Sequence, residues 1–218
     1  MQIDQFTAIA VTSITFVLSV GLSYLMTRSY LKMRSVSRLF WGLGLWIFAI
    51  SVLIELVFSL GAYSALLMQA YLVLVALLVQ LLAVGSVSLL KNQKVRYAYY
   101  AFTIFAAVLV VYSVAASSIT DLIMNYVVGG IPPNLVIYAS TIATVPATFA
   151  IIIVAALSYL KKRDWRMLSV IVGVITVAIA GTLYVVSLPA LLYLAEFIGI
   201  VLLWLGFIGP EKKWVLNC

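Results

Sequence analysis

Seven long apolar runs dominate the sequence, and each is long enough to cross a lipid bilayer as a helix. The hydrocarbon core of a bilayer is about 30 Å thick, so a spanning helix needs about 20 consecutive apolar residues. With 66% hydrophobic and 9% charged residues, the 218-residue chain has too little polar surface to cover a water-soluble globule. The sequence therefore predicts an all-α, polytopic membrane protein with one transmembrane domain, residues 1–218. Its seven helices are expected at about residues 6–26, 39–60, 65–90, 97–118, 134–160, 167–188 and 191–208.

The positions of the basic residues predict how this bundle is oriented. Four Lys and Arg residues follow the first run, three follow the third, four follow the fifth and two follow the seventh, which accounts for all thirteen. Cytoplasmic segments retain Lys and Arg. The sequence therefore predicts an N-terminus outside the cell, a cytoplasmic C-terminus, and a multi-pass protein of the plasma membrane whose surroundings are the lipid bilayer. The first run is preceded by Asp4 and by no basic residue, so we expect a retained helix and not a signal peptide.

Residue types that most metal and catalytic sites need are missing. The chain has no histidine and a single cysteine, Cys218, so the usual ligands of haem and catalytic zinc are absent. No nucleophile has a base to activate it, and no glycine-rich phosphate loop occurs. The net charge of +7 does not indicate nucleic-acid binding, because the basic residues flank apolar runs. We expect no enzymatic activity, metal, cofactor or nucleic-acid partner.

Short matches between the two halves of the chain indicate a possible internal repeat. The tetrapeptide Leu-Ser-Tyr-Leu closes the first run at 22–25 and the fifth at 157–160, and a basic segment follows each copy. Ala-Leu-Leu begins at Ala65 and again at Ala190. One interpretation is a parallel repeat of three helices, joined by the fourth helix as in repeat-built transporters. The alternative is coincidence, since Leu, Ala, Val and Ser dominate all membrane helices.

In outline, the helix count and orientation resemble those of two families. Sugar transporters of the three-plus-one-plus-three type share both features, but their Pro-Gln signature is absent and the first three runs contain no proline. Microbial rhodopsins also have seven helices, yet residues 191–208 lack the lysine that binds retinal. The sequence is assigned to neither family.

Two acidic residues, Glu55 and Glu196, lie inside apolar runs at the same expected depth. Each is five residues from the outer end of its helix, which at 1.5 Å per residue is about 7 to 8 Å below the outer boundary. A charged carboxylate at a helix centre costs roughly 2.5 to 3.5 kcal/mol on insertion scales, so such residues usually face a protein interior or a water cavity. If the two helices are neighbours, the carboxyls could share a proton and form a proton or cation site that opens outward. Alternatively, each Glu only hydrogen-bonds to another helix.

Other polar residues inside the runs are weaker candidates for a functional lining. Gln69 and Gln80 are three helical turns apart on one face, where buried amides either tie helices together or bind a ligand. Pro146 interrupts the fifth helix and acts there as a hinge or as a static kink. The predicted polar lining comprises Ser51, Gln69, Gln80, Tyr138, Thr144 and Thr148.

Three classes of function remain after these exclusions. The first is a non-enzymatic sensory or interaction protein, or an accessory subunit with a membrane protein partner or a second copy of itself. The second is a small proton- or cation-coupled transporter or channel that uses Glu55 and Glu196. The third, an enzyme, is disfavoured by the missing catalytic residues. The first class leads, because loops are short and a transporter is expected to have a more polar midplane.

Overall fold

The structure, a computed structural model, describes residues 5–119, 122–124, 127–128, 130–162, 168–177 and 189–207. Within these residues the fold is a bundle of helices. The long helices α1 to α5 are each long and apolar enough to cross a membrane, which confirms the predicted all-α class. The helices are α1 (Gln5–Met33), α2 (Val36–Ser59), α3 (Ala65–Val87), α4 (Gln93–Ala116), α5 (Asn134–Lys162), the short helix Leu168–Val177, and α7 (Pro189–Phe207).

Helix ends differ from the predicted ones because apolarity and helical hydrogen bonding stop at different residues. The first helix was expected to end near residue 26 but continues through the basic segment to Met33, and the next residue, Arg34, has a φ of 43°. The fourth begins at Gln93 because the Asn92 side chain caps it, accepting hydrogen bonds from the Lys94 and Val95 amides. Of the predicted helix 167–188, residues 168–177 are helical, and 167 and 178–188 lie outside the described residues.

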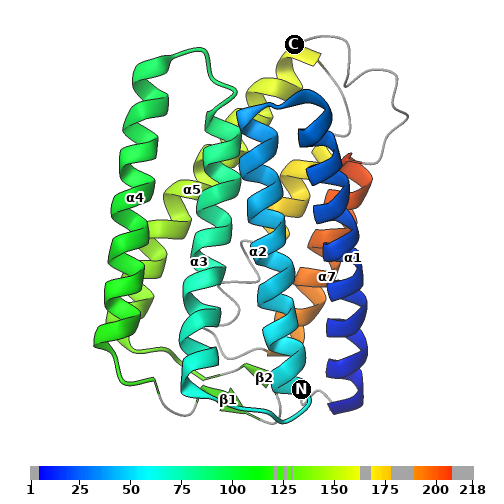
Figure 1. Ribbon diagram of the computed structural model, residues 1–218, viewed down its shortest axis with the longest axis vertical. Helices are drawn as coiled ribbons and strands as arrows, with labels where there is room; N and C mark the ends of the chain where they lie inside the picture. The colour runs from blue at the N-terminus through cyan, green and yellow to red at the C-terminus, as the bar shows by residue number, and fades with distance from the viewer. Residues whose placement is uncertain are drawn as a thin grey trace.

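A two-stranded hairpin lies in the segment between the fourth and fifth predicted helices. Strand β1 (Ile123–Met124) pairs antiparallel with β2 (Val127–Val128). The hairpin contacts α2, and Figure 1 places it at the end of the bundle where α2 ends and α3 begins. Two of its side chains, Leu122 and Val128, are buried. The hairpin therefore covers one end of the helix bundle.

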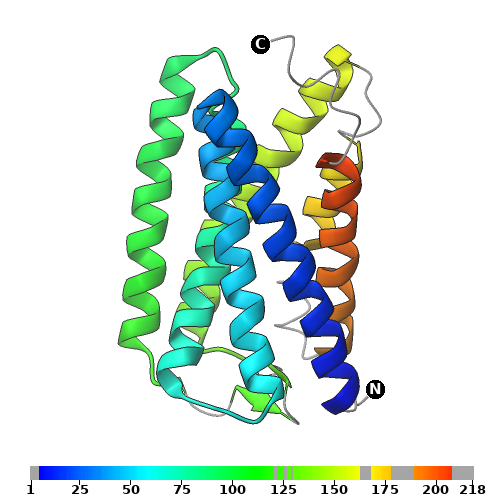
Figure 2. The same ribbon diagram turned by 45° about the vertical axis from the view of Figure 1, so that its right-hand side comes forward.

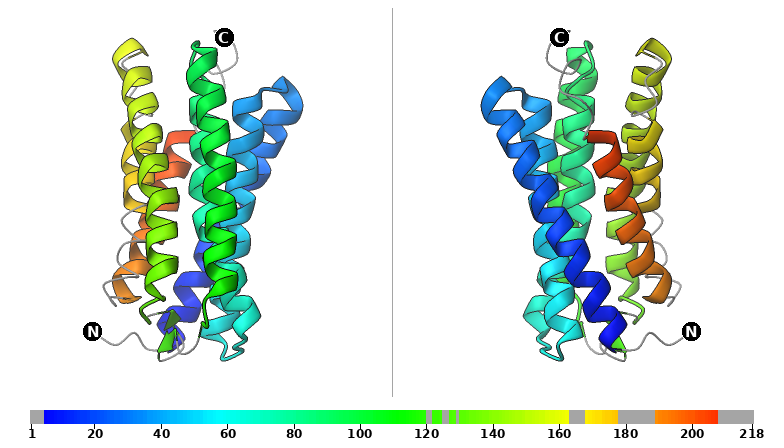
Figure 3. Two further views of the ribbon diagram at one scale, coloured as in Figure 1. Left: turned by 90° about the vertical axis from the view of Figure 1, so that its left-hand side faces the viewer. Right: turned by 90° about the vertical axis from the view of Figure 1, so that its right-hand side faces the viewer.

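The helices form two layers. Figures 1 and 3 show α1, α2 and α3 in one layer, with α5, the helix Leu168–Val177 and α7 in the other. The fourth helix packs against α3 and α5, and α7 packs against α1, as Figure 2 also shows. The central helices α2 and α3 bury the largest share of their apolar residues, whereas α4 exposes large apolar side chains such as Ile104 and Phe105. Such a surface suits lipid and not water.

Successive helices alternate in direction, so the basic segments meet at one end of the bundle. The last turns of α1, α3 and α5 lie there with the first turns of α2 and α4 (Figure 1). Every Lys and Arg among the described residues belongs to these segments: Arg28, Lys32, Arg34, Arg38, Lys91, Lys94, Arg96, Lys161 and Lys162. The opposite end holds the hairpin and the turn between α2 and α3. This separation of charge is what the predicted orientation requires.

A glycine brings α2 and α3 into close contact. A Cβ on Gly85 would lie 2.5 Å from Trp41 Cδ1 and 3.0 Å from the Ser37 carbonyl oxygen. Trp41 is itself buried, so its ring has little room to move. The residue at this position must therefore lack a side chain for α2 and α3 to pack as they do.

We expect Gly85→Ala to lower the free energy of unfolding by about 1 to 3 kcal/mol, because the added methyl group overpacks the contact between α2 and α3. Gly42→Ala is the matched control, since a Cβ there has Met26 Cγ as its nearest neighbour at an ordinary 3.7 Å. Unfolding by titration with a denaturing detergent measures both variants. If Gly85→Ala and Gly42→Ala unfold at the same free energy, the close contact of α2 and α3 at Gly85 does not limit their packing.

Candidate functional site

The structure brings Glu55 and Glu196 together inside the bundle. Glu55 lies one turn before the end of α2, and Glu196 lies two turns after the start of α7. Their side chains are 1% and 8% exposed, and the two carboxyls lie close enough to interact, although Glu55 Oε2 has no hydrogen bond of good geometry among the described residues. The equal depths expected from the sequence therefore correspond to a direct contact between two helices.

A hydrogen bond between two carboxyls requires a proton on one of them, because an ionised carboxylate only accepts. Two ionised carboxylates in direct contact would also repel each other strongly in a bundle interior of low dielectric constant. Sharing one proton removes most of that repulsion. The pair is therefore chemically suited to bind and release protons.

Tyr71 on α3 holds one member of the pair. Its hydroxyl donates a hydrogen bond of 2.5 Å to Glu55 Oε1, and its ring is 3% exposed. Sequence reasoning missed this residue. The position of Tyr71 along its helix could have identified it. Tyr71 is six residues inside α3, which places it about 9 Å from the outer end of that helix, close to the depth of Glu55. Applying the depth argument to hydroxyl groups as well as carboxyls would have found it.

Two buried oxygen atoms beside the pair lack well-formed hydrogen bonds within the described part of the chain. One is Glu55 Oε2, and the other is the hydroxyl of Tyr193, which is 2% exposed and lies near the backbone of Val128. Tyr193 is one turn before Glu196 on α7, so both side chains are on the same face. Buried polar atoms of this kind usually have a partner.

Apolar side chains enclose the pair at the end of the bundle that carries the hairpin. Tyr71 and Tyr193 belong to a buried cluster that draws on helices α1 to α5 and α7, on β2 and on the segment between α4 and β1. Its other members are Ala8, Ile54, Phe58, Met68, Leu72, Val114, Ile119, Leu122, Val128 and Val136. The site was expected to open outward, but the described residues around it form a closed, apolar cover, and Glu55 is almost fully buried.

Among the other predicted lining residues, Ser51 and Gln80 are buried. The Ser51 hydroxyl donates to the Ile47 carbonyl of its own helix at 3.0 Å. Gln80 joins three helices: its Nε2 donates to the Ala143 carbonyl of α5, and its Oε1 accepts from Thr103 of α4 at 3.1 Å. Gln80 thus ties helices together, which was one of the two interpretations of a buried amide given by the sequence. Gln69 is half-buried and has no hydrogen bond among the described residues.

The fifth helix presents small apolar residues, and not its polar ones, to the interior. Tyr138 is 67% exposed on the outer surface, so it does not line the bundle. Thr144 and Thr148 are half-buried, and each hydroxyl donates to a carbonyl of its own helix. The buried face of α5 comprises Val136, Ala139, Ala143, Ala147, Ile151, Val154 and Ala155. The polar stripe was misplaced because alanines allow α3 and α4 a closer approach than threonines would.

Pro146 lies within α5 and is exposed. A proline cannot donate the backbone hydrogen bond expected at its position, and its ring disturbs the preceding turn. Ala143, three residues before Pro146, has a carbonyl that accepts from Gln80. The interrupted turn of α5 is therefore braced by a side chain from α3, which favours a static kink over a free hinge.

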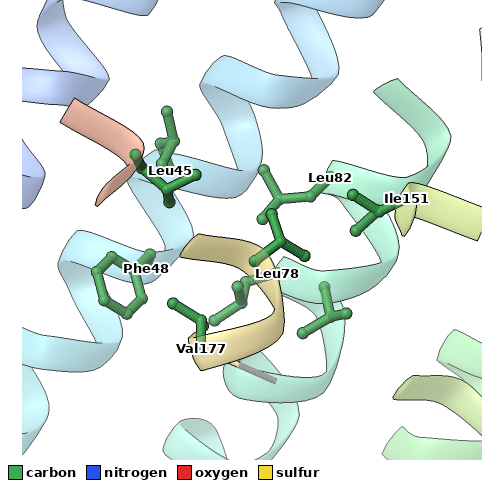
Figure 4. Close-up of a pocket in the computed structure, with 9 residues that line it drawn as sticks. Leu45, Phe48, Leu78, Leu82, Ile151 and Val177 are labelled. Carbon is green, nitrogen blue, oxygen red and sulfur yellow. The ribbon is translucent and has the colours of Figure 1, made fainter. Parts of the chain in front are cut away.

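An apolar pocket lies deeper in the bundle, towards the basic end from the carboxyl pair. Leu45 and Phe48 line it from α2, Leu78 and Leu82 from α3, Ile151 from α5, and Val177 from the helix Leu168–Val177 (Figure 4). No polar side chain contributes to its lining. The pocket therefore offers no ion-binding group and no polar route to the pair.

No family model, curated protein or solved structure matches this chain. Within the described residues, no three acidic, histidine or cysteine side chains gather in a group that could hold a metal ion. The carboxyl pair is therefore the feature of the described residues that points most directly to a function.

We expect Gln80→Leu to lower the free energy of unfolding by about 1 to 2 kcal/mol, because it removes the hydrogen bonds of Gln80 to the Ala143 carbonyl of α5 and the Thr103 hydroxyl of α4. Gln69→Leu makes the same chemical change on the same helix where no hydrogen bond is lost, so it serves as the control. Detergent-induced unfolding of both variants measures the difference. A Gln69→Leu variant as unstable as Gln80→Leu would show that the amide tie contributes nothing.

Replacing Tyr71 with Phe should cost about 1 to 2 kcal/mol of stability, because a hydrogen bond to a charged or proton-sharing carboxyl is stronger than a neutral one. Tyr112→Phe is the control, since that ring is 65% exposed on α4. The same unfolding assay applies. If Tyr71→Phe is as stable as Tyr112→Phe, the Tyr71 hydroxyl does not hold Glu55.

Proposed function

We propose that this chain is a non-enzymatic, seven-helix protein of the plasma membrane that senses protons through the Glu55 and Glu196 pair. Protonation and deprotonation of the pair would change how α2 and α7 pack, and the altered bundle would act on a membrane protein partner or on a second copy of the chain. The single observation that carries this proposal is the contact of two buried carboxyls on different helices. Buried ionisable residues inside membrane bundles are functional in most cases.

The seven-helix count and the orientation form part of the proposal. The helix Leu168–Val177 and the 19-residue α7 would supply the sixth and seventh spans. The gathering of all described Lys and Arg residues at one end supports a cytoplasmic location for that end. The pair would then lie towards the outer side of the membrane.

The internal repeat is also proposed, and one coincidence of position supports it. When Ala65 is aligned with Ala190, the start of the matching Ala-Leu-Leu triplets, Tyr71 is aligned with Glu196. Both of these side chains interact with Glu55. Matching positions in the two proposed halves thus approach the same residue of α2.

A proton- or cation-coupled transporter is the second candidate, and the shared carboxyl site favours it as well. Transport requires access to the site from both sides of the membrane. Glu55 and Glu196 are buried, and the pocket beyond them is lined by apolar residues alone. This packing favours a protein that responds to protons over one that conducts them.

The proposal predicts a proton that titrates with pH and belongs to the pair. Infrared difference spectroscopy of the reconstituted protein should show a protonated-carboxyl band that is lost at alkaline pH. Glu55→Gln and Glu196→Gln should each remove that titrating band, whereas Glu211→Gln, the same change in the basic C-terminal segment, should leave it unchanged. A wild-type protein with no titrating band would overturn the proposal.

The conformational part of the proposal has its own measurement. Spin labels at Leu60 and Leu194, both exposed, report the separation of α2 and α7 near the pair. In a Cys218→Ser background, the separation should change across the pH range in which the band titrates, and Glu55→Gln should abolish that change.

Liposomes loaded with a pH-sensitive dye test the second candidate, a transporter. Sustained proton flux that Glu55→Gln abolishes would favour it. Gentle solubilisation from native membranes should co-purify a stoichiometric partner, or a homo-oligomer.

A further inference from the structure

Among the residues that the structure describes, no positive charge lies beside the buried carboxyl pair. The titratable or charged side chains that face it are Tyr71 from α3 and Tyr193 from α7. Tyr63, from the turn between α2 and α3, lies near Tyr193. At this end of the bundle the described residues of α1, α4, α5 and the hairpin include no Asp, Glu, Lys or Arg, and α1 contributes the buried hydroxyls of Thr12 and Thr15. All described Lys and Arg residues lie at the opposite end of the bundle.

A pair that keeps at least one proton has two neutral states. If each carboxyl carries a proton, the site is neutral. If the pair shares one proton, it carries one negative charge, which is costly in an interior of low dielectric constant, and a bound monovalent cation would neutralise that charge. A divalent cation would give a neutral site only after both carboxyls had lost their protons, so a site that keeps one proton matches a monovalent cation.

The unpaired oxygens indicate where such a cation would bind. Glu55 Oε1 already accepts the Tyr71 hydrogen bond, whereas Glu55 Oε2 is buried and unpaired. The Tyr193 hydroxyl is also buried without a well-formed hydrogen bond, and it interacts electrostatically with both carboxyls. Hard cations prefer carboxylate, hydroxyl and carbonyl oxygens as ligands. These two oxygen atoms are thus chemically suited to a small cation and lie on two facing helices.

We propose that the Glu55 and Glu196 pair binds one Na⁺ in exchange for one of its two protons, with Glu55 Oε2 and the Tyr193 hydroxyl as ligands. In this exchange, the doubly protonated pair and Na⁺ give a singly protonated pair with bound Na⁺ and one released proton. The site is neutral before and after the exchange. The inference rests on the proposed proton-binding function, which it extends by naming a competing ligand.

The exchange makes a quantitative prediction. Because one proton leaves for each Na⁺ bound, the apparent Na⁺ affinity should rise about tenfold for each pH unit in the range where the pair is doubly protonated. The full-length protein in lipid nanodiscs, in weakly buffered solution with a pH dye, should release about one proton when NaCl replaces N-methylglucamine chloride at constant ionic strength. The Na⁺ concentration that gives half-maximal release provides the affinity.

Two variants separate the ligands from the surroundings. Tyr193→Phe should weaken the apparent Na⁺ affinity at least several-fold while the protonated-carboxyl infrared band still titrates. Tyr138→Phe, the same change at an exposed position on α5, should leave the affinity unchanged. Glu55→Gln should abolish Na⁺-linked proton release, and detergent unfolding confirms that each variant folds.

The outcomes distinguish this inference from the proposed function. A titrating infrared band without Na⁺-linked proton release would overturn the cation site and leave the proton site intact. If the folded wild-type protein shows neither the titrating infrared band nor Na⁺-linked proton release, both the proton site and the cation site are overturned. Proton release that N-methylglucamine or K⁺ produces as well as Na⁺ would also overturn the inference, because it would reflect ionic strength and not a small oxygen-lined site.

Discussion

The contact between the Glu55 and Glu196 carboxyls is the interaction on which the rest of this bundle depends. An isolated charge in an apolar interior is unfavourable by several kcal/mol, so a helix that carries one must direct it towards a partner. Here each acidic helix provides the partner of the other, and Tyr71 adds a third helix to the contact. The rotation and depth of α2, α3 and α7 are therefore linked through a few polar atoms. A change in the proton or ion content of these atoms acts on all three helices.

Such polar contacts form only where helices approach closely, and small residues permit that approach. Gly85 lets α3 reach Trp41 and the backbone of α2, and a Cβ on Gly199 would meet the Gly173 carbonyl at 3.3 Å. In lipid, helices associate through such packing and through hydrogen bonds, because the surrounding acyl chains are as apolar as leucine. Gly199 lies one turn after Glu196 on α7, whereas Gly85 lies near the other end of α3 from Tyr71.

Of the polar residues expected to line the interior, some are buried there and others are exposed, for a common reason. Glu55, Glu196 and Gln80 were identified because a charge or a primary amide inside an apolar run has few other places to go. Tyr138 and the α5 threonines were misassigned because Tyr and Thr hydroxyls are tolerated in lipid-facing positions, where a Thr hydroxyl can donate to its own helix. Tyr71 was overlooked for the same reason. The polarity of a hydroxyl is too weak to define the direction in which a helix faces.

By itself, the sequence determined that the chain is helical, that its apolar runs suit a membrane, and which segments carry positive charge, because all three follow from local composition and length. It also determined the equal depth of Glu55 and Glu196. Only the tertiary structure decided that Glu55 of α2 and Glu196 of α7 approach each other, that Tyr71 joins the pair, and that the hairpin packs at this end of the bundle. Those results depend on which helix faces pack together. That choice is made by side-chain contacts between residues far apart in the chain, which local apolarity does not encode.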